Sequence, residues 1–116
     1  MARVYVPDTG EVVWLQFNPQ AGHEQAGIRP ALVLSPAAYN RKTGLMLCCP
    51  ITSQVKGYPF EVLIPSGLPL TGAILSDHIK SLDWRARQAA HICALPPATV
   101  AEVLAKLRAI IDLPPA

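Results

Sequence analysis

Three features of the sequence predict a mainly β chain of the α+β class, folded as a compact barrel with one C-terminal helix. Twelve prolines and seven glycines divide the 116 residues into short segments, which favours strands and turns over a helix bundle. Segments such as Ala31-Leu32-Val33-Leu34 are apolar at every position, as expected of strands covered on both faces. Between Pro97 and Pro114 the apolar residues instead recur at intervals of three and four, which is typical of an amphipathic helix.

Six strands are expected before that helix, each bounded by turn or loop residues. Asp8-Thr9-Gly10 is a turn signal before the first strand, and Pro30 stands at the first position of the second, where its missing N–H does least harm. The expected strands cover residues 11–17, 30–35, 45–51, 60–64, 72–75 and 88–94.

Length and composition indicate one ordinary globular domain spanning residues 1–116. Hydrophobic residues make up 51% and charged residues 16%, which excludes a disordered chain. No apolar stretch is long enough to cross a bilayer and the N-terminus lacks a signal-peptide core, so a cytoplasmic location is expected. Cys48, Cys49 and Cys93 form neither an even disulfide set nor a C-x-x-C pair. We therefore expect reduced thiols, no metal and no cofactor.

Charge gives a weak indication of a polyanionic partner. The net charge is only +2, but residues 29–87 contain seven basic and three acidic side chains. A solvated surface explains this distribution equally well, and charge alone favours that simpler interpretation.

Polar side chains should converge at one rim of the barrel. If the first five strands form a meander, the rim collects the end of the first strand, the start of the second, the end of the third, the start of the fourth and the end of the fifth. The residues expected there are His23-Glu24-Gln25-Ala26-Gly27, Arg29, Thr52-Ser53-Gln54, Lys56, Ser76-Asp77-His78 and Lys80.

The pairing of the second and third strands predicts a specific juxtaposition. If they pair about the centre of the 37–44 connection, the numbers of facing residues sum to 81, which places Arg29 across from Thr52. Arg29 precedes a proline and is therefore biased toward an extended conformation. A guanidinium and a hydroxyl far apart in sequence should thus share one small patch.

Such a patch suits RNA cleavage without a metal, because the neighbouring 2′-OH supplies the nucleophile. Arg29 would stabilise charge on the phosphorane through its bidentate fork, and Thr52 would hydrogen-bond the phosphate. Glu24 is the candidate base for the 2′-OH, and no residue is assigned as the general acid. The simpler alternatives are an exposed arginine paired to Glu24 or Asp77 and a threonine that serves a turn.

The remaining candidate residues give weaker evidence for a catalytic or binding role. His23-Glu24 resembles the start of a zinc-protease motif, but Gly27 stands where the second histidine belongs, which excludes that motif. His91 lies in an apolar strand and is expected in the core. The aromatic residues available for stacking on bases, each equally suited to burial, are Trp14, Tyr58, Phe60 and Trp84.

Several longer motifs resemble the MazF/PemK family of toxin endoribonucleases, in the same order over nearly the whole chain up to the final helix. They are Tyr5-Val6-Pro7-Asp8, Glu24-Gln25-Ala26-Gly27, Arg29-Pro30-Ala31, Val33-Leu34-Ser35-Pro36, Lys42-Thr43-Gly44, Lys56-Gly57-Tyr58-Pro59-Phe60-Glu61-Val62 and Trp84-Arg85-Ala86-Arg87. The resemblance implies an SH3-like barrel with a short connecting helix, a homodimer, and an antitoxin whose disordered acidic tail occupies the RNA groove.

The resemblance also implies a reaction and a set of site residues. Single-stranded messenger RNA would be cut at short sequences, without a metal, leaving a 2′,3′-cyclic phosphate and a 5′-OH. The family's catalytic positions fall on Arg29, Thr52 and Glu24. The positions that contact RNA fall on Phe17, Gly22, Ser53, Lys56, Asp77 and His78.

Local departures from the family leave part of the function open. His23, His78, the 67–69 segment and the Pro-Pro-Ala tail are particular to this chain, so the recognition sequence cannot be carried over. The alternatives are a barrel toxin or adaptor that binds a protein such as a topoisomerase without cutting RNA, and an inactive relative that only binds partners.

Overall fold

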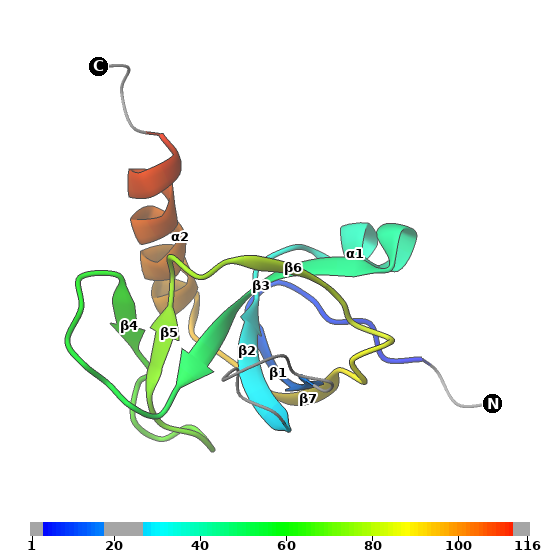
Figure 1. Cartoon of the computed structure of the whole chain (residues 1–116), viewed down its shortest axis with the longest axis horizontal. Helices are drawn as coiled ribbons and strands as arrows, with labels where there is room; N and C mark the ends of the chain where they lie inside the picture. The colour runs from blue at the N-terminus through cyan, green and yellow to red at the C-terminus, as the bar shows by residue number, and fades with distance from the viewer. Residues whose placement is uncertain (1–3, 18–26, 113–116) are drawn as a thin grey trace.

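The computed structural model describes residues 4–17 and 27–112. The elements in chain order are β1 (Glu11–Gln16), β2 (Ile28–Val33), α1 (Ala37–Thr43), β3 (Leu45–Thr52), β4 (Glu61–Leu63), β5 (Ala73–Leu75), β6 (Lys80–Asp83), β7 (Ala90–Ala94) and α2 (Pro97–Ile111). This order confirms a mainly β fold with a short connecting helix and a C-terminal helix (Figure 1).

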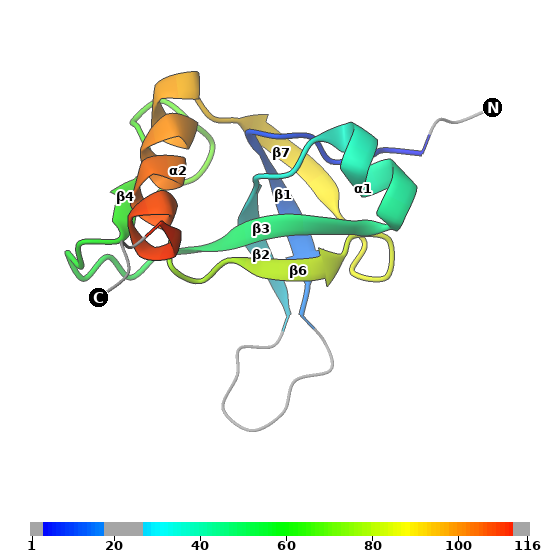
Figure 2. The ribbon, with the colours of Figure 1, turned by 90° about the horizontal axis from the view of Figure 1, so that it is seen from above.

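The strands form one bent antiparallel sheet in the order β4-β5-β3-β2-β1-β7, and β6 pairs with β3 beside this path. β3 is the central element, because it pairs with β2, β5 and β6. Figure 2 shows β3 and β6 side by side, with the two helices at opposite ends of the molecule. This curvature is compatible with a small SH3-like barrel.

The expectation of a simple meander is wrong beyond the third strand. β3 pairs with β5, and β4 occupies the outer position next to β5. Burial explains this order, because Ala73 and Ile74 of β5 are fully buried whereas Leu63 of β4 is 63% exposed. The more apolar of the two short strands takes the inner place. β5 consequently begins, and does not end, beside Thr52.

Strand β6 was absent from the six expected strands. Its sequence, Lys80-Ser81-Leu82-Asp83, has a single apolar residue and therefore no alternating pattern. Its backbone nevertheless pairs with Leu45–Cys48 of β3 over four residues. Main-chain hydrogen bonding, which no side-chain pattern records, creates this strand.

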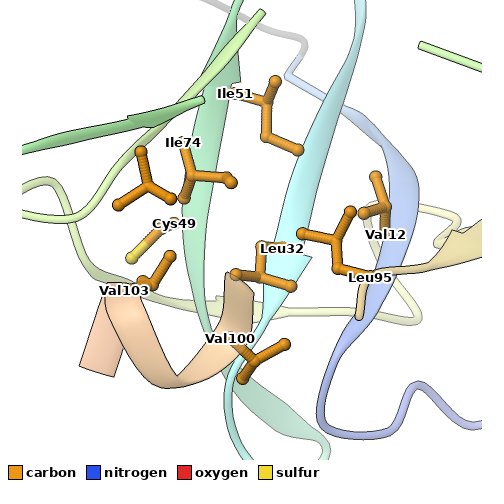
Figure 3. Close-up of a cluster of buried hydrophobic side chains, with 9 residues drawn as sticks. Val12, Leu32, Cys49, Ile51, Ile74, Leu95, Val100 and Val103 are labelled. Atoms are coloured by element: carbon orange, nitrogen blue, oxygen red, sulfur yellow. The ribbon is translucent and has the colours of Figure 1, made fainter. Parts of the chain in front are cut away.

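Two hydrophobic cores lie on the two faces of the sheet, which confirms strands buried on both sides. The α2 side holds the first core, where Val100 of the helix lies near Leu32 and Val103 near Cys49 (Figure 3), in a cluster that also includes Ile51. Residues of opposite parity build the second core, called here the second face: Val13, Leu15, Ala31, Val33, Met46, Cys48 and Trp84. All three cysteines are free, and burial raises the pKa of Cys48 and of Cys49 to about 12.

His91 was expected in the core, and this is wrong. Its side chain is 45% exposed, and its Nε2 lies 3.9 Å from Oε2 of Glu11 on the neighbouring strand. The ring also contacts Tyr5 edge-on, and the Tyr5 hydroxyl donates to Oε1 of Glu11. β7 lies at the edge of the sheet, and three of its five residues are exposed to solvent. His91 can therefore contact a polar partner at the surface.

Asn40 of α1 joins three segments from a fully buried position. Its Oδ1 accepts from the Ser35 hydroxyl at 2.6 Å, and its Nδ2 donates to the carbonyls of Pro7 at 2.8 Å and Ser35 at 3.0 Å. Asn40→Ala should lower the free energy of unfolding by about 3 kcal/mol, because buried polar groups lose their partners. Urea denaturation measures this, with Lys42→Ala on the exposed surface of α1 as control, expected within about 0.5 kcal/mol of wild type. An equal loss in both variants would contradict the buried-network explanation.

Candidate nucleic-acid interface

The register between β2 and β3 follows the prediction. Ala31 pairs with Pro50, Leu32 with Cys49 and Val33 with Cys48, so the facing numbers sum to 81 as expected. The pairing of the two strands ends at Ala31 and Pro50, and the same register extended by two residues would place Arg29 opposite Thr52. Both side chains are half-buried. The predicted juxtaposition is therefore consistent with the strand pairing.

Strand alternation places these two residues on the second face. Arg29 has the parity of Ala31 and Val33, and Thr52 has the parity of Cys48, all of which face that core. Leu15 of β1 is the Cα partner of Arg29, and Phe17, two residues on, packs against the same core. One end of the second face thus carries a guanidinium, a hydroxyl and an aromatic ring.

Two further cations surround that ring. Lys80 Nζ lies 6.0 Å and Arg87 Cζ 5.6 Å from the Phe17 ring centroid. Arg87 is anchored to β1, because its Nη1 donates to Gln16 O at 3.1 Å and its carbonyl accepts from Gln16 N at 2.8 Å. Lys80 lies opposite Cys48 in the β3–β6 pair. We call Phe17, Lys80 and Arg87 the Phe17 cluster.

The sequence did not assign Lys80 or Arg87 to this cluster. Both contributed to the basic bias of residues 29–87, and Lys80 was expected at the rim, but neither was linked to Phe17. The missing information was the existence of β6, which brings Lys80 beside β3, and the 84–88 turn, which returns Arg87 to β1. The Trp84-Arg85-Ala86-Arg87 motif was the sequence feature that could have pointed to Arg87 as a site residue.

Thr52 is oriented by the chain that follows it. Its Oγ1 accepts a hydrogen bond from the backbone N–H of Gln54 at 3.1 Å. A hydroxyl that accepts from the main chain still has its own proton to donate. Thr52 is therefore suited to donate to a phosphate oxygen. Ser53 and Lys56 follow on the exposed segment between β3 and β4.

Asp77 and His78 do not lie at the rim where they were expected. Because β5 runs antiparallel to β3 from Ala73, which faces Thr52, its far end brings Ser76 O within 3.7 Å of Cys49 Sγ. Asp77 and His78 follow there, 3.7 Å apart between Oδ1 and Nε2, with exposed fractions of 41% and 53%. The reversed direction of β5 accounts for this displacement along β3.

Glu24 and Gly22 lie outside the described residues, as does His23. Within residues 4–17 and 27–112, no group of three His, Cys, Asp or Glu side chains could hold a metal ion. A cavity of about 520 Å³ is lined by residues of β1, β2 and the 88–90 segment, namely Trp14, Leu15, Gln16, Ile28, Gln88 and Ala90. Trp14 is 42% exposed there, whereas Trp84 is buried in the second core.

Comparison with known proteins identifies the family. Residues 8–111 match the family described as PemK-like, MazF-like toxin of type II toxin-antitoxin system. The chain belongs to this family. Apart from residues 5–7, the motifs that suggested the resemblance lie within this match, which spans all the strands and α2, so family and fold agree.

Individual family members are similar over nearly their full length. The endoribonuclease toxin MazF of Escherichia coli K12 is 49% identical over 111 residues, which cover 96% of this chain and 99% of that protein. Crystal structures of MazF and of a MazE–MazF complex from Deinococcus radiodurans are each 57% identical, with TM-scores of 0.87 and 0.89. They cover 95% and 96% of this chain, which in turn covers 100% of each. No described helix is long and apolar enough to cross a membrane.

Proposed function

We propose that this chain is a sequence-specific endoribonuclease that cuts single-stranded messenger RNA without a metal ion. The observation that carries the proposal is the placement of Arg29 and Thr52 at the ends of adjacent strands, on the face that bears the Phe17 cluster. Family membership supports the general activity, because the MazF relative is an endoribonuclease toxin. The chain is accordingly an endoribonuclease toxin of a toxin–antitoxin system.

The reaction needs only groups that bind and polarise the phosphodiester. The 2′-oxygen attacks the adjacent phosphorus, the P–O5′ bond breaks, and the products are a 2′,3′-cyclic phosphate and a 5′-OH. Glu24 takes the proton from the 2′-OH, and the 5′-oxygen acquires a proton from a donor that we do not assign. Arg29 stabilises the charge on the phosphorane oxygens, and Thr52 donates to one of them.

Single-stranded RNA suits the surroundings of these residues. Lys80 and Arg87, which lie over the Phe17 ring, can attract the phosphates, and an unstacked base can pack against this cluster. Further contacts are assigned to Gly22, Ser53, Lys56, Asp77 and His78. His78 is 53% exposed beside Asp77, so this pair can present hydrogen-bonding groups to a base edge.

The proposed assembly is a cytoplasmic homodimer of one 116-residue domain with a cognate antitoxin. The MazE–MazF relative supports the antitoxin, and the cations of the Phe17 cluster suit a disordered acidic tail. Size exclusion of the free chain and of the complex tests both assignments. A strictly monomeric free chain would contradict the dimer.

A single 2′-deoxy sugar at the cut site should abolish cleavage, because it removes the nucleophile. We expect a loss of more than about 1,000-fold in rate for the deoxy substrate, while EDTA leaves cleavage of the all-ribose RNA unchanged. The substrates are matched oligonucleotides whose cut site is first mapped on a long defined RNA. A deoxy sugar one nucleotide upstream is the control and should be cut. Cleavage at the deoxy position, or loss of activity with EDTA, would contradict the mechanism.

A further inference from the structure

The segment of residues 53–60, which joins β3 to β4, carries two of the proposed RNA contacts. It begins directly after Thr52 and contains Ser53 and Lys56. Residues 53–59 are all exposed, so apolar packing contributes little to their order. Segments of this kind are ordinarily among the first to open. Polar contacts must therefore hold the segment in one conformation.

Glu61, the first residue of β4, provides the central contact. Its Oε1 accepts from the backbone N–H of Gly57 at 2.8 Å and of Lys56 at 3.1 Å, and its Oε2 lies 3.3 Å from Lys56 N. Its own N–H donates to Tyr58 O at 3.0 Å, which closes the turn. Hydrogen bonds to a carboxylate are about twice as strong as neutral ones. One half-buried side chain thus fixes two successive peptide units.

Both ends of the segment are tied as well. At the start, Gln54 N–H donates to the Thr52 hydroxyl at 3.1 Å. At the end, Lys106 Nζ of α2 donates to Pro59 O at 2.6 Å. Between these two contacts, the hydrogen bonds that Glu61 accepts fix the position of the Lys56 backbone.

Glu61 engages Lys56 through its backbone and not through its charge. None of the ion pairs within residues 4–17 and 27–112 involves the Lys56 ammonium, whose Nζ lies 5.9 Å from the Tyr58 ring centroid. A carboxylate that paired with this ammonium would compete with a phosphate. Because it binds the amide instead, it orders the lysine and leaves its charge available.

We propose that Glu61 is a positioning residue for RNA binding. It holds the 53–60 segment so that Lys56 is already ordered when it binds a phosphate of the RNA. The proposal rests on the proposed function and adds a residue to its substrate-binding machinery. Ordering a long side chain and its loop on binding costs affinity, and prior ordering removes that cost.

Glu61→Ala should raise KM about tenfold and change kcat less than about threefold, because substrate binding and not phosphate chemistry is affected. Glu61→Gln keeps one acceptor oxygen, and its KM should lie between those of wild type and Glu61→Ala. Binding of a 2′-deoxy oligonucleotide should weaken by the same factor as KM rises. Glu61→Gln supplies this comparison even if the alanine variant does not fold.

A double-mutant cycle separates positioning from general destabilisation. If Glu61 acts through Lys56, Glu61→Ala should add less than about twofold to KM in a Lys56→Ala background. Asp8→Ala is the matched control, since Asp8 Oδ1 also accepts from two backbone N–H groups, those of Thr9 and Ala37, both at 2.9 Å. Asp8 lies near the opposite end of β2, so its variant should lose stability without a change in KM.

An unchanged KM in Glu61→Gln and Glu61→Ala, or fully multiplicative effects in the cycle, would overturn the positioning role. The proposed function fails differently. If the wild-type chain does not cleave RNA, or if Arg29→Ala cleaves it normally, the enzyme assignment is lost. If wild type cleaves and Arg29→Ala does not, while Glu61 variants keep their KM, only the positioning role is lost.

Discussion

Arg29→Ala should lower kcat by about 100- to 1,000-fold, the usual loss when one preorganised donor to a developing oxyanion is removed. Arg29 lies at the start of β2 and is half-buried, so its removal leaves both cores intact. The free energy of unfolding should therefore stay within about 0.5 kcal/mol of wild type. Single-turnover cleavage of the mapped RNA measures the effect, together with urea denaturation.

Two further variants show that the guanidinium, and not net charge, is responsible. Arg29→Lys keeps the charge but loses the bidentate fork and should recover only a small part of the rate. Arg108→Ala removes an equal charge from the exposed side of α2 and should cleave normally. In cells, Arg29→Ala should lose toxicity while still binding the antitoxin. A variant that stays fully toxic would favour the non-enzymatic alternative, a toxin that binds a protein such as a topoisomerase.

Gly72→Ala should lower kcat about 100-fold, because it displaces Thr52. A Cβ at Gly72 would lie 2.1 Å from Thr52 O and 3.0 Å from Thr52 C, and both are backbone atoms that cannot rotate away. Gly72 O also accepts from Ile64 N at 3.0 Å, which limits its own retreat. The strand end must shift by about 1 Å, a displacement that typically costs 10²-fold at a catalytic group.

The effect of Gly72→Ala has a matched control at Gly67. Both glycines have positive φ, +127° at Gly72 and +92° at Gly67, but a Cβ at Gly67 meets no heavy atom within 4 Å. Gly67→Ala should therefore show only the backbone cost of about 1–2 kcal/mol, without loss of kcat. Cleavage assays at a temperature where both variants are folded measure this difference. Equal activity in the two variants would mean that Thr52 is not displaced or not required.

Much of the site's geometry was readable from local sequence. The sum of 81 for the facing residues of β2 and β3 is borne out by three pairs, because a seven-residue helix and Gly44 connect the strands symmetrically about their midpoint. Gly44 has a φ of +75° and ends α1, which fixes where β3 begins. Short connections transmit register directly, so the pairing of β2 with β3 could be predicted before any coordinates.

Longer connections prevented the same kind of prediction for β4 and β5. The 53–60 segment and the 64–72 segment allowed β4 to fold outward and β5 to enter beside β3 in the opposite direction, which moved Asp77 and His78 along the sheet. β6 has one half-buried apolar residue, so no periodicity indicated it. The location of Lys80, and hence half of the cation pair around Phe17, depends on that strand.

The sequence by itself determined the family, the mainly β class, the terminal helix and the register between β2 and β3, because these depend on composition, periodicity, long motifs and one short connection. Only the tertiary structure decided the order of β4 and β5, the Phe17 cluster, the contact of Gly72 with Thr52 and the hydrogen bonds from the Lys56 backbone to Glu61. Each of these is a main-chain contact or a packing choice between segments far apart in the chain, and side-chain patterns along one segment carry no record of it.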